Sequence, residues 1–293
     1  MKKIKILIGC LSFNELTGSE LYVYELAKSL LKFDYDVSVV SPRMGGKLTK
    51  LANDCGIKVY NFNTLNKKEN FDLIHCQHLP VTQELIKLFP ITNKICTIHS
   101  EVNSLENPVQ HFSIFKYIAI RPEIKEHLIK NFKLPSEMIE VIYNPIDETR
   151  FNTNDARNDG YLLFVGTLDY LRMETIFDLI KYTKENNKEF WLVGKNHSNY
   201  LPQIMSNSHV KYFESTVDIE KFVKNCDVTA GILLGRTTIE GWMCGKSGWI
   251  YNVNDKGQIL GKELFSPPSD MDKFYVSNVV NKINDEYKKI INI

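Results

Sequence analysis

The sequence predicts an α/β protein that is built from two open, parallel sheets in tandem. Short β-branched runs alternate with amphipathic segments over residues 4–253, which is typical of βα units and a parallel sheet. A polar, turn-forming stretch over residues 144–160 divides this alternation into two series. We therefore expect an N-terminal domain over residues 1–150, a C-terminal domain over 151–270 and a C-terminal helix over 271–293.

The first series begins with a strand over residues 4–9 and a helix over 19–31 that carries apolar residues on one face. Pro122 is well placed as the first residue of a later helix, because the first turn needs no backbone N–H there. The elements expected after the first helix are strand 37–40, helix 47–55, strands 58–62 and 73–76, helix 81–88, strands 94–98 and 117–120, helix 122–131 and strand 139–143.

The second series repeats the alternation after the polar stretch. The expected elements are strand 161–165, helix 173–183, strands 190–193 and 210–213, helix 218–225, strand 228–231, helix 237–244 and strand 249–253. Residues 271–293 carry apolar side chains at helical spacing, which predicts the C-terminal helix. In such sheets, ligands bind at the carboxyl ends of the strands.

Composition and charge exclude several classes of protein. With 43% hydrophobic and 24% charged residues, the chain is neither collagenous nor disordered. Its 36 Lys and Arg against 35 Asp and Glu argue against a polyanion as the main partner. No uncharged apolar run approaches about 18 residues, so we expect no transmembrane helix. The six cysteines lack metal-site spacing and the N-terminal apolar stretch is too short for a signal peptide, so we expect a cytoplasmic protein.

The loop after the first strand contains Gly18 and Ser19 directly before a helix. Backbone N–H groups at such a helix start can approach a phosphate, because glycine has no side chain and the helix dipole favours an anion. An ordinary N-cap at Ser19 would explain the same residues without a ligand. His75 and His99 each end an expected strand, which makes them candidates for the ligand crevice. We expect no metal, since no histidine pair with helical ligand spacing accompanies them.

The densest polar cluster spans residues 235–246, GRTTIEGWMCGK. It opens a helix with two hydroxyls, Thr237 and Thr238, and places Glu240 one turn in. Such a helix start can bind a diphosphate and leave Glu240 to accept hydrogen bonds from sugar or ribose hydroxyls. A capping box, with Thr237 as N-cap and Glu240 at the third position, fits equally well.

The ordered motifs TGSE, HCQH, TIHS, VIYNPIDETRF, LLFVGTLDYLRM, WLVGK and TTIEGWMCGKSGWI resemble the retaining nucleotide-sugar glycosyltransferases of family four. The resemblance covers residues 1–253 and implies the GT-B fold, which has two facing Rossmann-like domains. It further implies that the C-terminal helix packs back across the domain junction. Under this resemblance, Gly18 and Ser19 meet the donor diphosphate, and His99 reaches the donor sugar near its anomeric carbon.

The diphosphate-binding loop after residue 164 departs from the family pattern. Family members usually carry Arg directly after Gly166 and Lys five positions further on, whereas this sequence has Thr167 and Arg172. One of two cations is therefore absent, and the other has a planar guanidinium in place of an ammonium. Gly166, Thr167 and Arg172 remain the implied donor contacts of this loop.

Glu240 matches the second carboxylate of the family's E-x7-E motif, which binds the nucleotide ribose. The first carboxylate would fall at Ile232, where no acid exists. Arg236 is the nearest new charge, and our hypothesis is that it replaces the cation that Thr167 does not offer to the diphosphate. Thr237 and Thr238 complete the implied donor site.

The resemblance implies transfer of a sugar from a nucleoside diphosphate, for which we expect UDP, to an acceptor hydroxyl with retention of configuration. His99 and Glu240 are the implied catalytic residues, and no cofactor is expected beyond the donor substrate. A DNA-modifying glycosyltransferase, a sugar-nucleotide epimerase and a non-catalytic sugar-nucleotide-binding protein stay open as alternatives.

The acceptor is undecided among a glycan, a lipid-linked acceptor and a nucleic acid. One cluster of basic residues in the first domain could bind an anionic membrane or a nucleic acid, although its acidic neighbours favour an ordinary solvated helix face. It consists of Lys116, Arg121, Lys125, Lys130 and Lys133.

Overall fold

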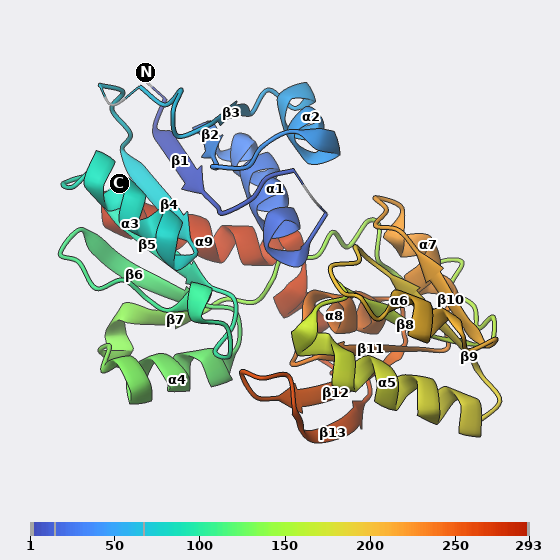
Figure 1. Ribbon diagram of the computed structural model, residues 1–293. Coiled ribbons are helices and arrows are strands. Elements are labelled where there is room, and N and C mark those ends of the chain that lie inside the picture. The colour runs from blue at the N-terminus through green and yellow to red at the C-terminus, as the bar shows by residue number, and fades with distance from the viewer. Residues whose placement is uncertain (1–2, 15, 67, 292–293) are drawn as a thin grey trace. The chain divides into compact units, whose positions relative to one another are not determined.

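The computed structural model describes residues 3–14, 16–66 and 68–291, which form two compact units (Figure 1). The first unit comprises the chain up to Pro145 together with the chain from Lys273 onward. The second unit comprises Ile146–Asp272. Each unit has its own sheet with helices against it, which confirms the predicted α/β fold class.

The sheet of the first unit runs in the order β3-β2-β1-β4-β5-β6-β7, and all its described strand pairs are parallel. Its strands are β1 (Lys5–Gly9), β2 (Asp36–Val40), β3 (Lys58–Tyr60), β4 (Leu73–Gln77), β5 (Lys94–Ile98), β6 (Ile114–Ala119) and β7 (Ile139–Val141). The strand order reverses between β1 and β4, and ligands bind at such a switch point, outside the carboxyl ends of the strands.

The helices of this unit cover both faces of the sheet. They are α1 (Gly18–Leu30), α2 (Gly46–Asp54), α3 (Leu79–Leu88), α4 (Pro122–Phe132) and the C-terminal α9 (Val276–Ile291), with 3-10 turns at Leu31–Phe33, Ser104–Glu106 and Ser136–Met138. Alternate strand residues pack on opposite faces, so Ile6 and Ile8 of β1 join the core under α1 and α9, whereas Leu7 joins the core under α3 and α4. Because both faces are covered, β4 and β5 are buried along their whole length.

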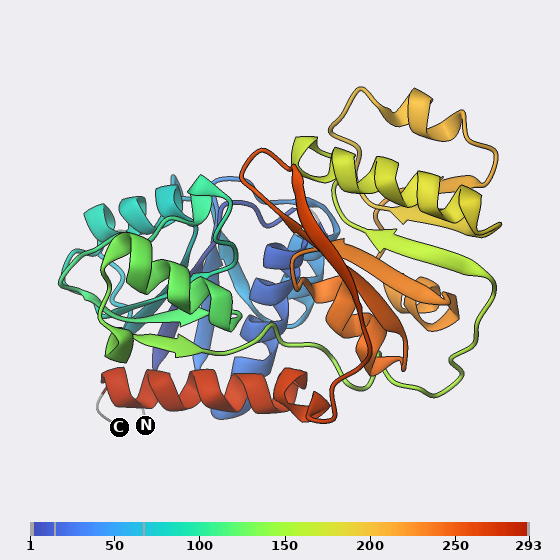
Figure 2. The same cartoon turned by 90° about the horizontal axis from the view of Figure 1, so that it is seen from below.

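Helix α9 lies along the first unit, although the chain reaches it only after the second unit (Figure 2). Its apolar stripe is buried against α1 and the sheet, and consists of Val279, Val280, Ile283, Tyr287 and Ile290. We expected helix from residue 271, but a 3-10 turn over Met271–Phe274 comes first and the α-helix begins at Val276. The amphipathic stripe starts only at that residue, which explains the later start.

The sheet of the second unit runs in the order β10-β9-β8-β11-β12-β13. Its elements are β8 (Tyr161–Val165), α5 (Tyr170–Glu185), β9 (Glu189–Val193), α6 (Leu201–Met205), β10 (Val210–Phe213), α7 (Ile219–Asn225), β11 (Val228–Ile232), α8 (Arg236–Met243), β12 (Ser247–Val253) and β13 (Ile259–Phe265). Strands β8 to β12 pair in parallel, as in a Rossmann-like domain.

Strand β13 corrects the expectation of purely parallel sheets, because it pairs antiparallel with β12 at the sheet edge. A tight turn, in which the N–H of Gly257 donates to the carbonyl of Asn254, reverses the chain before it. Most of β13 is exposed, so its sequence ILGKELF carries no alternation of apolar and polar residues to reveal a strand. No helix of the described ranges is long and apolar enough to cross a membrane.

Candidate functional site

The start of α1 lies at the switch point of the first sheet. The helix begins at Gly18 with Thr17 as N-cap, so the alternative of a cap at Ser19 is wrong. Gly18 is exposed, and a Cβ placed there would meet no atom within 4 Å. The backbone at this helix start is therefore accessible, as an anion-binding role requires.

His99 directly follows β5 and is held through both its backbone and its ring. Its N–H donates to Oε2 of Glu106 at 3.1 Å, and its Nε2 lies 2.9 Å from Oε1 of Gln77. The ring of Tyr22 packs edge-on against the imidazole, with 4.9 Å between ring centroids. Burial lowers the pKa of His99 well below its usual value. The imidazole is therefore neutral near pH 7 and suits hydrogen bonding better than proton donation.

His78 and Glu106 connect the loops around His99, and neither was predicted from the sequence as a site residue. Nδ1 of His78 accepts from the N–H of Leu11 at 3.4 Å, and its Nε2 lies 3.3 Å from Oε1 of Glu106. Burial lowers the pKa of His78 to about 4 and raises that of Glu106 to about 7. Because the imidazole is neutral, we interpret this contact as a hydrogen bond donated by Nε2–H rather than an ion pair.

The backbone of His78 supports a special role for this position. Its φ of 64° lies in the left-handed region, which a non-glycine residue adopts at a cost. Its two ring contacts hold the loop after β1 and the loop after β5 to the end of β4. The second histidine of the HCQH motif was the one sequence signal that could have found it, whereas Glu106 has no such signal.

His75 corrects one expectation of the sequence analysis, because it does not lie at the carboxyl end of its strand. Strand β4 continues to Gln77, and the His75 side chain is fully buried within the sheet packing. Its Nδ1 lies 2.5 Å from the hydroxyl of Tyr287, and its Nε2 lies 2.6 Å from the hydroxyl of Thr97. Burial lowers the pKa of His75 to about 3. His78 and His99 therefore follow the carboxyl ends of β4 and β5, whereas His75 does not.

In the second unit, the predicted diphosphate loop follows β8. Gly166 is packed so closely against β9 that a Cβ on Gly194 would lie 2.0 Å from the Gly166 carbonyl oxygen. Arg172 Nη1 lies 2.5 Å from Oδ2 of Asp169, and both side chains are 27% exposed. Thr167, which directly follows Gly166, is half-buried. The one cation that the loop retains therefore already has a carboxylate partner.

Helix α8 begins at the carboxyl end of β11 and carries the predicted ribose-binding acid. Its N-cap is Gly235, so the capping box with Thr237 as N-cap is wrong. Glu240 instead accepts from Nε of Arg236 at 2.6 Å, with side chains only 4% and 9% exposed. This pair places one acid and one cation together in the first turns of the helix.

The two threonines of α8 have different surroundings. The hydroxyl of Thr237 lies 3.4 Å from the carbonyl of Val165, at the end of β8 beside the diphosphate loop. Thr238 is fully buried, and a Cβ on Gly248 would lie 2.7 Å from its methyl group. Thr237 is therefore near the other predicted donor residues of this unit, whereas Thr238 packs α8 onto β12. The donor role of both stays a prediction.

The cluster of basic residues predicted in the first unit does not form one exposed patch. Arg121 is buried and paired with Glu101. Lys116 and Lys125 are half-buried and donate to main-chain carbonyls, which leaves Lys130 and Lys133 exposed. Over the ranges that the structure describes, no three His, Cys, Asp or Glu side chains could together hold a metal ion.

Residues 16–150 match the family model described as Glycosyltransferase Family 4. This part of the chain is therefore similar to the glycosyltransferases of family 4, as the motifs predicted, and the protein is a glycosyltransferase. A comparison with curated protein sequences finds no significant match.

Solved structures share the fold of this glycosyltransferase over nearly its whole length. A glycosyltransferase from Rickettsia africae ESF-5 is 16% identical, covers 99% of both chains and has a TM-score of 0.71. Anabaena Alr3699/HepE in complex with UDP-glucose is 17% identical, covers 98% of this chain and 92% of its own, and has a TM-score of 0.64. The pneumococcal O-GlcNAc transferase GtfA in complex with UDP and GlcNAc is 9% identical, covers 100% of both chains and has a TM-score of 0.72. These likenesses confirm the predicted GT-B fold.

Proposed function

We propose that this glycosyltransferase transfers a sugar from a UDP-sugar to an acceptor hydroxyl with retention of configuration. The buried pair of Glu240 and Arg236 at the start of α8 is the observation on which the proposal rests. A carboxylate accepts hydrogen bonds from ribose hydroxyls, and a guanidinium together with helix N–H groups suits a diphosphate. The UDP and UDP-glucose in the similar solved structures support uridine as the base.

In this proposal, the leaving diphosphate is stabilised without a metal ion. The first turn of α8 supplies N–H donors, and Arg172 and Arg236 of the same unit supply positive charge. Each arginine has a carboxylate neighbour, so the local charge of each pair is near zero. The N–H groups therefore carry more of the stabilisation than in a site with free cations.

His99 contacts the donor sugar as a neutral hydrogen-bonding group. Its depressed pKa keeps the imidazole uncharged near pH 7, so it can orient a sugar hydroxyl without changing the net charge of the site. Gln77 and Glu106 hold its ring and its backbone. We assign no protein nucleophile, because the proposed roles of His99 and Glu240 are in binding and stabilisation.

A thermal-shift screen tests the donor. UDP or a UDP-sugar at about 100 times its Kd should stabilise the protein by about 2.7 kcal/mol, which corresponds to a rise in Tm of several degrees. GDP, ADP and TDP should shift the Tm less at equal concentration. Stabilisation by another nucleotide, or by none of the four, would contradict the proposed donor.

Turnover and its stereochemistry are tested by incubating the protein with the UDP-sugar that binds in the screen and with acceptors. NMR of the product should show the anomeric configuration of the donor sugar. Arg236→Ala should raise the donor KM or abolish turnover, whereas the matched control Arg157→Ala, which changes an exposed arginine of the same unit, should not. Free or epimerised sugar without an acceptor would indicate an epimerase, and tight donor binding without turnover would indicate a binding protein.

A further inference from the structure

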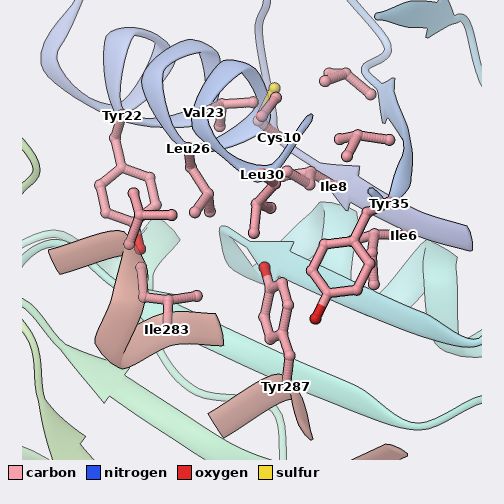
Figure 3. Packing of buried hydrophobic residues seen from close by; sticks show 14 of the residues in the cluster. Ile6, Ile8, Cys10, Tyr22, Val23, Leu26, Leu30, Tyr35, Ile283 and Tyr287 are labelled. Atoms are coloured by element: carbon pink, nitrogen blue, oxygen red, sulfur yellow. The ribbon is translucent and has the colours of Figure 1, made fainter. Parts of the chain in front are cut away.

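A row of buried polar side chains crosses the core of the first unit from α9 to α1. The hydroxyl of Tyr287 lies 2.5 Å from Nδ1 of His75, and Nε2 of His75 lies 2.6 Å from Oγ1 of Thr97. Oγ1 of Thr97 lies 3.1 Å from the hydroxyl of Tyr22. All four side chains are fully buried. Figure 3 shows Tyr22 and Tyr287 entering this core from α1 and α9.

The row continues to His99 through the geometry of the sheet. Strands β4 and β5 pair with Gln77 opposite Thr97, so His75 and Thr97 are diagonal neighbours, as are Gln77 and His99. Side chains two residues apart in a strand share a face, so these four lie on the face that α1 covers. The ring of Tyr22 then packs edge-on against His99. The row therefore reaches His99 through the Tyr22 ring, while Gln77 contacts the imidazole independently of the row.

Each hydrogen bond in the row depends on its neighbours. A neutral imidazole donates through one ring nitrogen and accepts through the other, so the orientation of one hydroxyl determines that of the next. Loss of one member leaves a buried polar group without its partner, which favours a rearrangement of the remaining members. A change at α9 can therefore alter the rotamer of Tyr22, whose hydroxyl is held by Thr97.

We propose that Tyr287 and His75 are positioning residues for the glycosyl transfer. Through Thr97 and Tyr22, the C-terminal helix sets the orientation of the His99 ring towards the donor sugar. This inference rests on the proposed function, because it assigns His99 a donor contact. It gives α9 a role in catalysis although the helix supplies no residue to the strand ends.

The chain offers a matched control for the removal of one hydroxyl on the same helix. Tyr35 donates from its hydroxyl to Oδ1 of Asn284 at 2.6 Å, and both side chains are buried. This bond also ties the core to α9, but it is directed to Asn284 and not to the row. Tyr35→Phe and Tyr287→Phe should therefore cost similar stability, and only Tyr287→Phe should disturb His99.

Steady-state kinetics with the UDP-sugar that the thermal-shift screen identifies should separate the two variants. Tyr287→Phe is expected to lower kcat about three- to tenfold with a smaller change in KM, whereas Tyr35→Phe keeps the wild-type kcat. The kcat effect of Tyr287→Phe should vanish in a His99→Gln background. Equal kcat values for the two tyrosine variants, or an undiminished effect in that background, would overturn the inference.

Two further measurements keep the test decisive. The ¹⁵N shifts of the His99 imidazole should change in Tyr287→Phe and not in Tyr35→Phe. If Tyr287→Phe does not fold, Thr97→Val should lower kcat in its place and Thr97→Ser, which keeps the hydroxyl, should restore it. A wild-type protein that turns over no nucleotide sugar refutes the proposed function. Unchanged ¹⁵N shifts of His99 in Tyr287→Phe refute the positioning role of the row.

Discussion

The pH dependence of stability should reveal Glu106 as a buried carboxyl that is costly to ionise. Its pKa rises from an ordinary 4.5 to about 7 because the side chain is buried. The native state then holds the proton more tightly than the unfolded state does. The stabilisation from this proton is fully present below pH 4.5 and is lost as the pH rises through 7.

The size of the effect follows from the two pKa values. Complete ionisation costs on the order of 3 kcal/mol of unfolding free energy, and about 2 kcal/mol of this falls between pH 5.5 and 8. Glu106→Gln keeps the shape and one acceptor oxygen but removes the titration. The stability difference, variant minus wild type, should therefore increase by about 2 kcal/mol from pH 5.5 to pH 8.

Urea unfolding followed by circular dichroism measures this difference. The comparison with the variant cancels the titration of groups that do not contact Glu106. His78 does contact it, but with a native pKa of about 4 its imidazole stays neutral from pH 5.5 to pH 8. The tryptophans Trp191, Trp242 and Trp249 all lie in the second unit, so their fluorescence reports that unit separately. A stability difference that stays constant within about 0.5 kcal/mol over this pH range would refute the reasoning.

Two further predictions concern the donor site. Gly18→Ala should change the unfolding free energy by less than about 1 kcal/mol, since no atom lies within 4 Å of the new Cβ, but it should raise the Kd for UDP at least about tenfold in calorimetry if a phosphate approaches this backbone. Arg236→Ala and Glu240→Ala should each destabilise the protein by about 3 kcal/mol in urea unfolding, because each breaks the buried ion pair between the two side chains. The double variant should lose less than the sum of the two, and strict additivity would argue against the pair.

Much of the fold could be predicted because its strands are buried on both faces. Runs such as residues 73–76 and 94–98 are apolar enough to be recognised as central strands, and the helices between them carry clear apolar stripes. The exposed strand Ile259–Phe265 escaped prediction because one partner strand and solvent on the other side impose no pattern. The short helix Leu201–Met205 also escaped prediction, because five residues with one buried side chain show no helical periodicity.

The motifs of the proposed donor site were recognised from the sequence, whereas the long-range partners of the predicted site residues were not. Arg236 and Glu240 lie one helical turn apart, so their contact is local and follows from the spacing. The bond between Glu106 and the backbone of His99 joins a loop to a strand end with no motif to mark it. Neither spacing nor composition predicts such a contact.

The sequence by itself determined the α/β alternation, the division into two series and the motifs of a glycosyltransferase. These features depend on short-range patterns of burial and on residues that lie close together in the chain. Only the tertiary structure decided that His75 faces Tyr287, 212 residues further on, and that His78 rather than His75 reaches the strand end beside His99. The reason is physical, because parallel strands bring distant segments into register and burial then determines which of their polar groups must pair.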